Sequence, residues 1–326
     1  MSINFTKFPS LENTYRQKEI DKIQSMMIQD KWVVTEKVHG ANFSFWVTED
    51  NGTVNIKCAK RSGWIEDDEK FFNYRCVLEK YKPMLTKLRE GLFTDFVIYG
   101  EMYGGNIQNG MCYSLEQDFV AFDMRWINKD RSLSTPLPKL GTLTLEKDYY
   151  IPVVPLIGVY DSFEEALAVG ESFTSKLIRP DFDGVEKHKE AEGVVIEPDT
   201  AVYEPNGSRV YLKKKTKRFL EKGGKPNIKS KSPVVLQESV KVKLEEALVF
   251  LNHNRFYSVV SKIGEVSIKD IGKVMGLLTQ DIIVDMEKDL EQPVDSWFET
   301  KGEKQLFMKN LQKTVQDFVK PLLLSL

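Results

Sequence analysis

The sequence predicts an α+β protein with two domains: a larger domain built on antiparallel sheets, followed by a small all-α domain. Segments in which apolar and polar residues alternate recur between residues 31 and 215, which is typical of half-buried strands. Beyond residue 236 the apolar residues recur at helical spacing instead, and no strand pattern competes. A segment rich in glycine, proline and lysine separates these regions. We therefore predict domains at residues 1–231 and 232–326.

Composition narrows the class of protein. The 326 residues allow about two domains at roughly 150 residues each, and a hydrophobic content of 41% is enough for a core. The formal net charge is -2, so any surface for nucleic acid must be local. The three cysteines and three histidines show no metal-ligand spacing, which argues against a zinc site and favours a reducing compartment. No apolar run suits a signal peptide or a membrane span, so we expect a cytoplasmic protein, or one in the host cytoplasm if it is viral.

The candidate nucleophile, Lys37, lies between the first two predicted strands. Residues 31–35 form an apolar strand pattern and residues 42–47 alternate, so Lys37 falls at a strand–turn–strand junction. Gly40 follows in the turn and, having no Cβ, allows a bulky ligand to approach the backbone. A lysine amine attacks phosphorus only when deprotonated, so nearby cations, a metal or burial must lower the pKa of Lys37. The bare Lys-x-x-Gly pattern also fits an exposed turn lysine.

Local signals place a helix before these strands and a hairpin after them. A capping box at residues 14–17 and apolar residues at helical spacing as far as Met27 predict an N-terminal helix. The Asp-Asn-Gly sequence at residues 50–52 predicts a tight hairpin. Its second strand returns toward the nucleophile and ends near Arg61. Arg61 is therefore a candidate phosphate or ribose contact, and equally a candidate surface arginine.

Two later strands are each apolar except for one acid. Residues 96–103 contain Glu101, and residues 119–124 contain Asp123. A carboxylate in an apolar strand is costly unless it is paired or binds a metal, so these acids indicate a site. Phe122 precedes the second acid and faces the opposite side of its strand. Its ring could stack on a base or pack in the core.

Three further segments complete the middle of the chain. Residues 67–91 have helical spacing, with Pro83 as a break. Residues 128–149 are expected to form an irregular connection. Residues 162–165 fit a capping box that opens a short helix ending near Gly170.

The last strands of the larger domain carry an acid and a row of lysines. Residues 192–198 predict a strand with Glu192 at its mouth, just before a glycine. In the next strand Lys213 and Lys215 point to one face and Lys214 to the other. Two ammonium groups on one face need an anion, and a triphosphate would serve. The alternative is a solvated basic edge that deters strand pairing.

This strand opens a basic run that extends to the domain boundary. Between residues 209 and 231 there is one acid and ten basic residues, a concentration that indicates a local surface for a polyanion. The basic residues are Arg209, Lys213, Lys214, Lys215, Lys217, Arg218, Lys222, Lys225, Lys229 and Lys231. Beyond it, helical patterns cover residues 236–252, 255–263, 268–286 and 305–324.

Taken in order, these motifs resemble the covalent nucleotidyltransferases, the class that contains ATP-dependent nucleic-acid ligases and mRNA capping enzymes. The resemblance is closest to the bacteriophage T4 RNA ligase 2 family and spans nearly the whole chain. It implies a nucleotidyltransferase, or ATP-grasp-like ligase, domain followed by the helical domain. Residues 10–13, 58–61, 261–265 and 273–277 also look like stretches of that family.

The resemblance implies an ATP-dependent RNA ligase that acts in three steps. Lys37 attacks the α-phosphate of ATP and releases pyrophosphate, which leaves AMP on the lysine. AMP then moves to the 5′-phosphate at a nick in duplex RNA, and the 3′-hydroxyl displaces it. The reaction implies Mg²⁺ or Mn²⁺, because phosphate and carboxylate oxygens favour these ions. We expect a monomer with no obligate protein partner.

The same resemblance implies contacts to the nucleotide. Glu36 would contact adenine, and Phe122 would stack on it. Arg61 would bind ribose or phosphate. Lys213 and Lys215 would bind the α-phosphate.

Other matched positions would serve the chemistry. His39 would assist a later step, and Asn42 would touch phosphate and the 5′-end. Glu101 and Glu192 would hold the metal or the ribose. Charge proximity from Lys215 and the metal would lower the pKa of Lys37. The catalytic set implied is Lys37, His39, Glu101, Glu192, Lys213 and Lys215.

Other functions compete with this one. The rivals are a DNA ligase and a GTP-using capping enzyme. A minimal DNA ligase would carry a β-barrel after the catalytic domain, and the segment beyond residue 231 shows no strand pattern, which argues against both rivals. A non-enzymatic nucleic-acid binder would use the basic run alone. Glu101, Asp123 and Glu192 argue against such a binder, because they would repel a polyanion unless metals lay between them.

Overall fold

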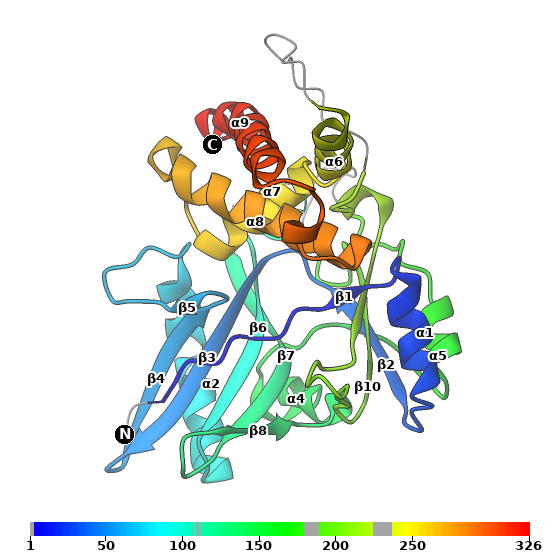
Figure 1. Ribbon diagram of the computed structural model, residues 1–326. Coiled ribbons are helices and arrows are strands. Elements are labelled where there is room, and N and C mark those ends of the chain that lie inside the picture. Colours follow the sequence, from blue (N-terminus) through cyan, green and yellow to red (C-terminus); the bar gives the residue numbers. More distant parts are fainter. Residues whose placement is uncertain (1–2, 106, 109–110, 112, 179–188, 224–236) are drawn as a thin grey trace. The chain divides into compact units, whose positions relative to one another are not determined.

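Figure 1 shows a computed structural model of the chain, which describes residues 3–105, 107–108, 111, 113–178, 189–223 and 237–326. The chain divides into two compact units, Met1–Phe219 and Leu220–Leu326. The predicted boundary at Lys231 lies outside the described residues. The first unit contains two sheets, named here sheet A and sheet B, and the second unit is helical. The predicted α+β class with antiparallel sheets and a helical C-terminal region is confirmed.

Sheet A is built from segments that lie far apart in the sequence. Its strand order is β1-β11-β10-β2-β9, and all pairs are antiparallel except β1 with β11. Helices α1 (Gln17–Ser25) and α5 (Phe163–Ala168) cover one face, where Ile23, Trp32 and Phe163 are buried in one core. The strands are β1 (Glu12–Asn13), β2 (Trp32–Lys37), β9 (Leu156–Tyr160), β10 (Gly193–Pro198) and β11 (Leu212–Lys215).

Sheet B consists of two antiparallel three-stranded units, β3-β4-β5 and β6-β7-β8, joined by the pairing of β3 with β6, and one long helix packs on it. Its order is β5-β4-β3-β6-β7-β8. Helix α2 (Tyr74–Leu92) lays Tyr81, Leu85 and Leu88 against the aromatic face of the sheet. The strands are β3 (Ala41–Asp50), β4 (Thr53–Lys60), β5 (Gly63–Trp64), β6 (Phe96–Gly104), β7 (Gln117–Ile127) and β8 (Leu133–Pro136).

The hairpin and the α5 cap follow their local sequence. Asp50 pairs with Thr53, so the two-residue loop is Asn51-Gly52, and both residues have positive φ, as a type I′ turn requires. The Ser162 side chain accepts a hydrogen bond from the Glu165 amide at the start of α5. The hairpin and the helix are confirmed, whereas only the Ser162 half of the capping box is present, since the Glu165 carboxylate accepts from the Asp161 amide instead of the Ser162 amide.

Other local predictions are wrong. Helix α1 starts after Arg16, which makes no side-chain cap, so the capping box at residues 14–17 is absent, and Met27 is 80% exposed. Pro83 lies inside α2 rather than breaking it, because buried residues on both sides hold the helix against sheet B. Residues 128–149 are not irregular: they form β8 and the short helices α3 (Lys139–Thr142) and α4 (Leu145–Tyr149).

The second unit is a helical bundle around one core. Its helices are α6 (Glu238–Leu248), α7 (His253–Ile263), α8 (Ile271–Leu290) and α9 (Lys301–Ser325). Phe256, Leu278 and Phe307 are fully buried where these helices meet. The predicted helices are therefore confirmed. None of the described helices is long and apolar enough to span a membrane.

Candidate active site

The turn after Lys37 carries the chain from one sheet to the other. Lys37 is the last residue of β2 in sheet A, and β3 of sheet B begins at Ala41. At Gly40 a Cβ atom would collide with the Met102 carbonyl and press on the Glu101 side chain. Gly40 is therefore required by close packing against β6, the strand that holds Glu101.

Three adjacent strands of sheet A place one lysine on each side of a glycine. Gly193 of β10 pairs with Lys37 of β2 and with Lys215 of β11, so the three residues form one row across the sheet. Directly paired residues share a face, and the missing side chain of Gly193 leaves space between the two lysines. Gly193 has a φ of +147°, and a Cβ there would collide with the Lys214 carbonyl, so only glycine fits.

Glu192 fills the space between these lysines. One carboxylate oxygen, Oε2, lies 2.8 Å from Lys37 Nζ and 3.3 Å from His39 Nδ1, and the other, Oε1, lies 2.7 Å from Lys215 Nζ. The Glu192 side chain is 4% exposed. Burial alone would raise its pKa, but Lys215, Lys37 and His39 hold the pKa of Glu192 well below its usual range. Glu192 is therefore an ionised carboxylate shared among three predicted site residues.

Glu101 approaches the same lysine from sheet B. It pairs with Asn42 of β3, so both side chains project from the same face of sheet B. Burial raises the pKa of Glu101 to about 8, against the opposing effects of Lys37 and Arg61, and the charge of Glu192 raises it further. The site thus contains one ionised carboxylate and one whose proton is held at neutral pH.

His39 is held on three sides. Its backbone amide donates to the Tyr113 hydroxyl at 2.8 Å, and its ring meets the Phe219 ring at 4.9 Å between centroids. Glu192 is the third contact. Sequence reasoning missed Tyr113 and Phe219, because a lone aromatic residue outside a periodic segment gives no signal of its partner.

Glu36, predicted to contact adenine, is buried and already accepts two hydrogen bonds. Its carboxylate accepts from the Ser175 hydroxyl and, at 2.8 Å, from the Lys176 amide. Burial raises the pKa of Glu36, while these hydrogen bonds oppose the shift. Ser175 and Lys176 are further residues that the sequence did not single out.

Phe122 and Arg61 lie beside the N-terminal segment. The Phe122 ring is partly exposed and packs edge-on against Phe8, with centroids 4.8 Å apart. Arg61 donates through Nη2 to the Ser10 hydroxyl at 2.9 Å. Residues 3–11 therefore support two predicted nucleotide contacts, although they form no regular element.

Lys214 is directed away from its neighbours, as predicted from strand alternation. Its ammonium donates to the carbonyls of Leu167 (3.1 Å) and Val169 (2.8 Å) at the end of α5, and it pairs with Glu171 at 3.3 Å. Lys214 thus satisfies the last carbonyls of a helix, a common position for a cation. Lys213 is partly exposed and pairs with Val195 across the strands.

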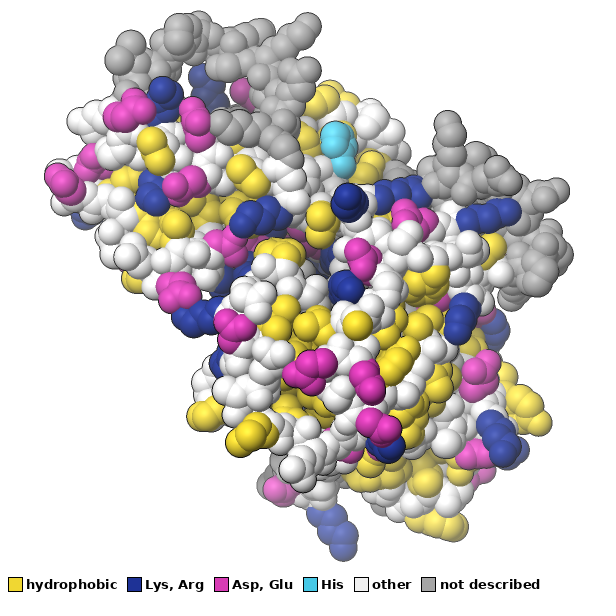
Figure 2. Space-filling model, turned by 90° about the vertical axis from the view of Figure 1, so that its right-hand side faces the viewer, with side chains coloured by type: hydrophobic (Ala, Val, Ile, Leu, Met, Phe, Trp, Pro, Cys, Tyr) yellow, Lys and Arg dark blue, Asp and Glu magenta, His cyan; other side chains and the backbone are white. Residues whose placement is uncertain are grey.

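Asp123 and Arg209 are buried together. Of the two roles expected for Asp123, pairing or metal binding, the structure shows pairing, with Arg209. Arg209 is 8% exposed and so does not belong to a basic surface. The end of the basic run, from residue 224 to Lys231, lies outside the described residues. On the face seen in Figure 2, basic and acidic side chains are interspersed rather than gathered in one basic band.

The donor set for a metal is small. Among the described residues, no group of three or more His, Cys, Asp or Glu side chains is arranged to hold a metal ion. Glu101 and Glu192 are close enough for the charge of one to affect the pKa of the other. Two carboxylates fit a hard divalent ion that takes its remaining oxygen ligands from phosphate and water.

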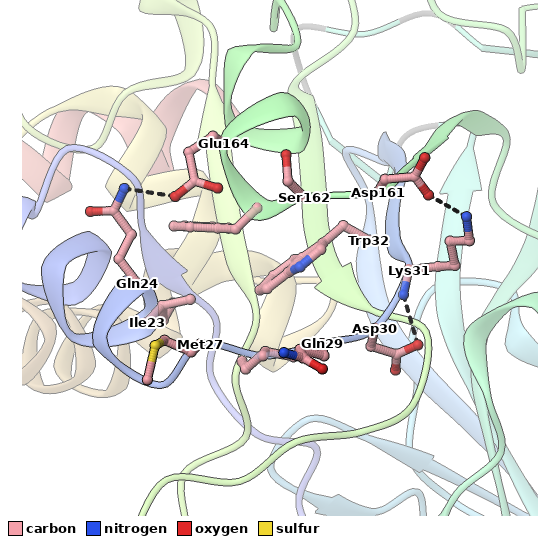
Figure 3. Close-up of a pocket in the computed structure, with 12 residues that line it drawn as sticks. Ile23, Gln24, Met27, Gln29, Asp30, Lys31, Trp32, Asp161, Ser162 and Glu164 are labelled. Carbon is pink, nitrogen blue, oxygen red and sulfur yellow. Dashed lines mark hydrogen bonds and ion pairs between the residues drawn. The ribbon is translucent and has the colours of Figure 1, made fainter.

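A separate cavity lies at the opposite end of β2. It has a volume of about 660 Å³ and is lined by residues from α1, β2 and the start of α5, including Trp32, Asp161 and Glu164 (Figure 3). Gln24 donates to Glu164 across it at 3.1 Å. None of the predicted site residues lines this cavity.

A lysine at a sheet junction, flanked by acids and further lysines, is an arrangement that suits a covalent nucleotidyltransferase. Residues 30–215 match the family model described as RNA ligase, and residues 234–317 match that described as T4 RNA ligase 2 C-terminal. Since the first match covers more than half of the chain, the chain belongs to the RNA ligase family. It is an ATP-dependent RNA ligase of the T4 RNA ligase 2 family.

Two curated proteins and one solved structure are similar to this chain. RNA-editing ligase 2, mitochondrial, of Trypanosoma brucei brucei is 25% identical, over 89% of this chain and 85% of its own. RNA-editing ligase 1, mitochondrial, of the same organism is 27% identical over 27% of this chain and 21% of its own. A mutant apo form of Naegleria gruberi RNA ligase has a TM-score of 0.48 and 20% identity, over 67% of this chain and 57% of that chain.

Proposed function

We propose that the protein seals nicks with 3′-hydroxyl and 5′-phosphate ends in duplex RNA, through a covalent intermediate on Lys37. The observation that carries this proposal is the row of Lys37, Gly193 and Lys215 across three strands, with Glu192 between the lysines. Lys37 supplies an amine that can attack phosphorus, and Lys215 supplies a second cation on the same face. The space above Gly193 between them would accommodate the phosphate.

The first step forms a bond between Lys37 Nζ and the α-phosphorus of ATP. The bond from that phosphorus to the bridging oxygen breaks, pyrophosphate leaves, and the amine loses its proton. The ion pair between Lys37 and Glu192 must open first, because only the neutral amine is nucleophilic. Lys213 and Lys215 would bind the α-phosphate and stabilise the charge that develops on it.

The base and sugar would be held by residues around this row. Phe122 would stack on adenine and Glu36 would contact the base. Arg61 would bind ribose or phosphate through its guanidinium fork. Asn42, paired with Glu101, would contact phosphate and the RNA 5′-end.

A divalent ion, Mg²⁺ or Mn²⁺, would be held by Glu101 and Glu192, where it would neutralise phosphate charge. A proton on Glu101 has to leave before this carboxylate can act as a ligand, since metal ligands are deprotonated. His39, placed by Tyr113 and Phe219, would assist a later step.

In the later steps a 5′-phosphate oxygen attacks the AMP phosphorus and the bond to Lys37 Nζ breaks. The 3′-hydroxyl then attacks the activated 5′-phosphorus, forms the phosphodiester and expels AMP. We assign engagement of the nicked duplex to the helical domain, because the proposed nucleotide contacts all lie before residue 220. The match to the T4 RNA ligase 2 C-terminal family supports this assignment and favours RNA over DNA.

Covalent labelling tests the first step. The protein is incubated with α-labelled ATP or GTP and Mg²⁺, and the bound label is followed on a denaturing gel. We expect a label from ATP that is absent in Lys37→Ala. Lys214→Ala is the matched control, since Lys214 faces away from the site and should keep the label. A label from GTP alone would assign capping chemistry, and an unchanged label in Lys37→Ala would exclude Lys37.

The substrate is tested by joining. A 5′-labelled strand in a nicked duplex is offered as all RNA, as all DNA and as a single strand without a complement. We expect a joined product from the RNA duplex above all. Equal joining of the DNA duplex would contradict the RNA preference, and efficient joining of the single strand would contradict nick sealing.

A further inference from the structure

Four charged side chains beside Phe122 form a buried network that the proposed reaction does not use. Lys139 Nζ lies 2.7 Å from Glu197 Oε1, Arg209 Nη2 lies 2.8 Å from Glu197 Oε2, and Arg209 Nη1 donates to Asp123. Asp123, Lys139 and Glu197 are each 3% exposed. Two positive and two negative charges balance, but burying four charges costs so much desolvation that a hydrophobic cluster would often be more stable. The network therefore calls for a role other than stability.

The network joins the two sheets at fixed positions. Asp123 lies on β7 of sheet B and Glu197 on β10 of sheet A. Lys139 is the first residue of α3, and its backbone amide donates to the Asp199 carbonyl at 2.8 Å, just beyond β10. The Asp199 side chain also accepts from the Leu140 amide at 2.7 Å. The position of Lys139 is thus set by the end of β10.

From this position Lys139 makes a second bond, to Phe122. Its ammonium donates to the Phe122 carbonyl at 2.8 Å. In the register of β6 with β7, Ala121 pairs with Gly100 and Asp123 pairs with Tyr99, so Phe122 is left without a partner on β6. Such a β-bulge redirects a side chain and leaves a residue outside the ladder. Lys139 therefore binds the backbone at the one residue of this stretch that β6 does not hold.

We propose that Lys139 is a positioning residue, held by Glu197, that fixes the bulge so that the Phe122 ring presents a face to the adenine of ATP. This inference rests on the proposed stacking role of Phe122. Phe8 already supports the ring edge-on, so a fixed backbone leaves the ring little freedom to turn. Without Lys139, the Phe122 carbonyl loses its hydrogen-bond donor and the Phe122 ring is no longer held in one orientation.

The test uses the full-length protein with Lys139→Met, which keeps the length of the side chain and removes the ammonium. The rate of AMP transfer to Lys37 is measured against ATP concentration. We expect the KM for ATP to rise about tenfold with little change in kcat, because base–aromatic stacking is worth about one to two factors of ten in affinity. A fluorescent 2-aminopurine triphosphate, which is quenched on stacking, should lose most of its quenching in the variant.

A second variant separates positioning from charge balance. Lys139→Met leaves the network with an excess negative charge, which Lys139→Met combined with Glu197→Gln removes. We expect the double variant to regain thermal stability while its KM for ATP stays raised. Arg89→Met is the control for a lost buried ion pair: Arg89 pairs with Asp95 at 2.9 Å and with Glu49 at 3.4 Å, away from Phe122. It should lower stability and leave the KM unchanged.

The outcomes are distinguishable. If the double variant regains the parent KM and quenching, or if Lys139→Met never changes them, the positioning role is wrong. Phe122→Ala tests the proposed stacking itself. No change of KM or quenching in that variant would show that the Phe122 ring does not stack on adenine. If Lys139→Met fails to fold, the double variant decides alone, since its charge is balanced.

Discussion

Sheet A and sheet B each bring one carboxylate to Lys37, and their surroundings give the two carboxylates opposite proton affinities. Glu192 precedes β10 in sheet A, and although burial opposes ionisation, Lys215 and Lys37 hold its pKa well below the usual range. Glu101 extends from β6 of sheet B, where burial prevails over Lys37 and Arg61 and raises its pKa to about 8. Burial is common to both. The difference comes from ion pairs, which Glu192 makes with two lysines in the neighbouring strands of its own sheet.

Two glutamates near the same lysine are therefore suited to different roles, because their pKa values are shifted in opposite directions. Glu192 is a fixed charge that orders the lysines, whereas Glu101 is a proton-bearing group that a cation could ionise. Environments that separate the pKa values of neighbouring acids are a mark of functional sites. Three substitutions test the comparison.

The largest effect is expected from Glu192→Gln. A depressed pKa means that the charge of Glu192 contributes stability above the unfolded pKa, and that this contribution is lost as pH falls through the folded pKa. Removing the charge leaves the Lys37 and Lys215 ammonium groups without their carboxylate. We expect the free energy of unfolding at pH 7 to fall by about 3 kcal/mol, as for a broken buried pair. Urea unfolding with and without the substitution measures it.

Adenylylation should fall as well, because the lysines lose their alignment. A Glu192→Gln protein with parent stability would show that the carboxylate is not essential to the cluster. The same unfolding series at lower pH provides a control, since the gap between parent and variant should narrow as Glu192 itself becomes protonated.

Glu101→Gln should have the opposite sign and a smaller size. For an acid with a raised folded pKa, stability is fully present below the unfolded pKa and is lost as pH rises through the folded pKa, here about 8. Glutamine avoids this loss. In EDTA we expect equal stability at pH 4 and a variant that is more stable by on the order of 1 kcal/mol at pH 8, since water near this partly exposed group screens the charge.

Adding Mg²⁺ should narrow that gap at pH 8, because the parent carboxylate gains a ligand that glutamine binds poorly. A gap that shrinks with rising pH in EDTA would mean that the pocket holds Glu101 ionised, and the contrast between the two sheets would disappear.

The smallest effect is expected from Lys214→Met. Lys214 caps the last carbonyls of α5, so its loss should cost about 0.5–1 kcal/mol of stability. Adenylylation per folded molecule should stay at the parent level, unlike in Lys215→Met on the other face of the same strand. Thermal unfolding and labelling on the same samples give both numbers. Loss of labelling in Lys214→Met would show that strand alternation does not separate the roles of these lysines.

Much of the fold could be predicted from the sequence because its signals are local. The Asn51-Gly52 turn, the alternation in β3 and the helical spacing of α7 and α9 depend only on neighbouring residues. The helix that begins after Ser162, with the Ser162 side chain as its cap, was predictable for the same reason. The failures at residues 14–17 and at Pro83 are also local signals, but there packing against a sheet outweighed propensity.

A site residue could be predicted where it stands in a sequence motif. It could not be predicted where only its contact with a distant residue reveals its role. Lys37, Glu192 and Lys215 stand in recognisable motifs, and the structure brings them together. Asp123 stood in one as well, but its partner Arg209 lies 86 residues away, so its buried pairing was invisible. Lys139 lies in a segment without periodicity, and nothing local marks its bond to the Phe122 carbonyl.

The parallel pairing of β1 with β11 has a consequence for how the protein is made. Glu12 pairs with Leu212, a residue that the ribosome adds 200 positions later. Sheet B, complete by residue 136, can form on the nascent chain, whereas sheet A needs five segments, the last ending at Lys215. Pairings of such long separation form slowly. The row of Lys37, Gly193 and Lys215 is therefore the last part of the two sheets to be assembled, and a chain still in synthesis cannot consume ATP before nearly the whole first unit has been made.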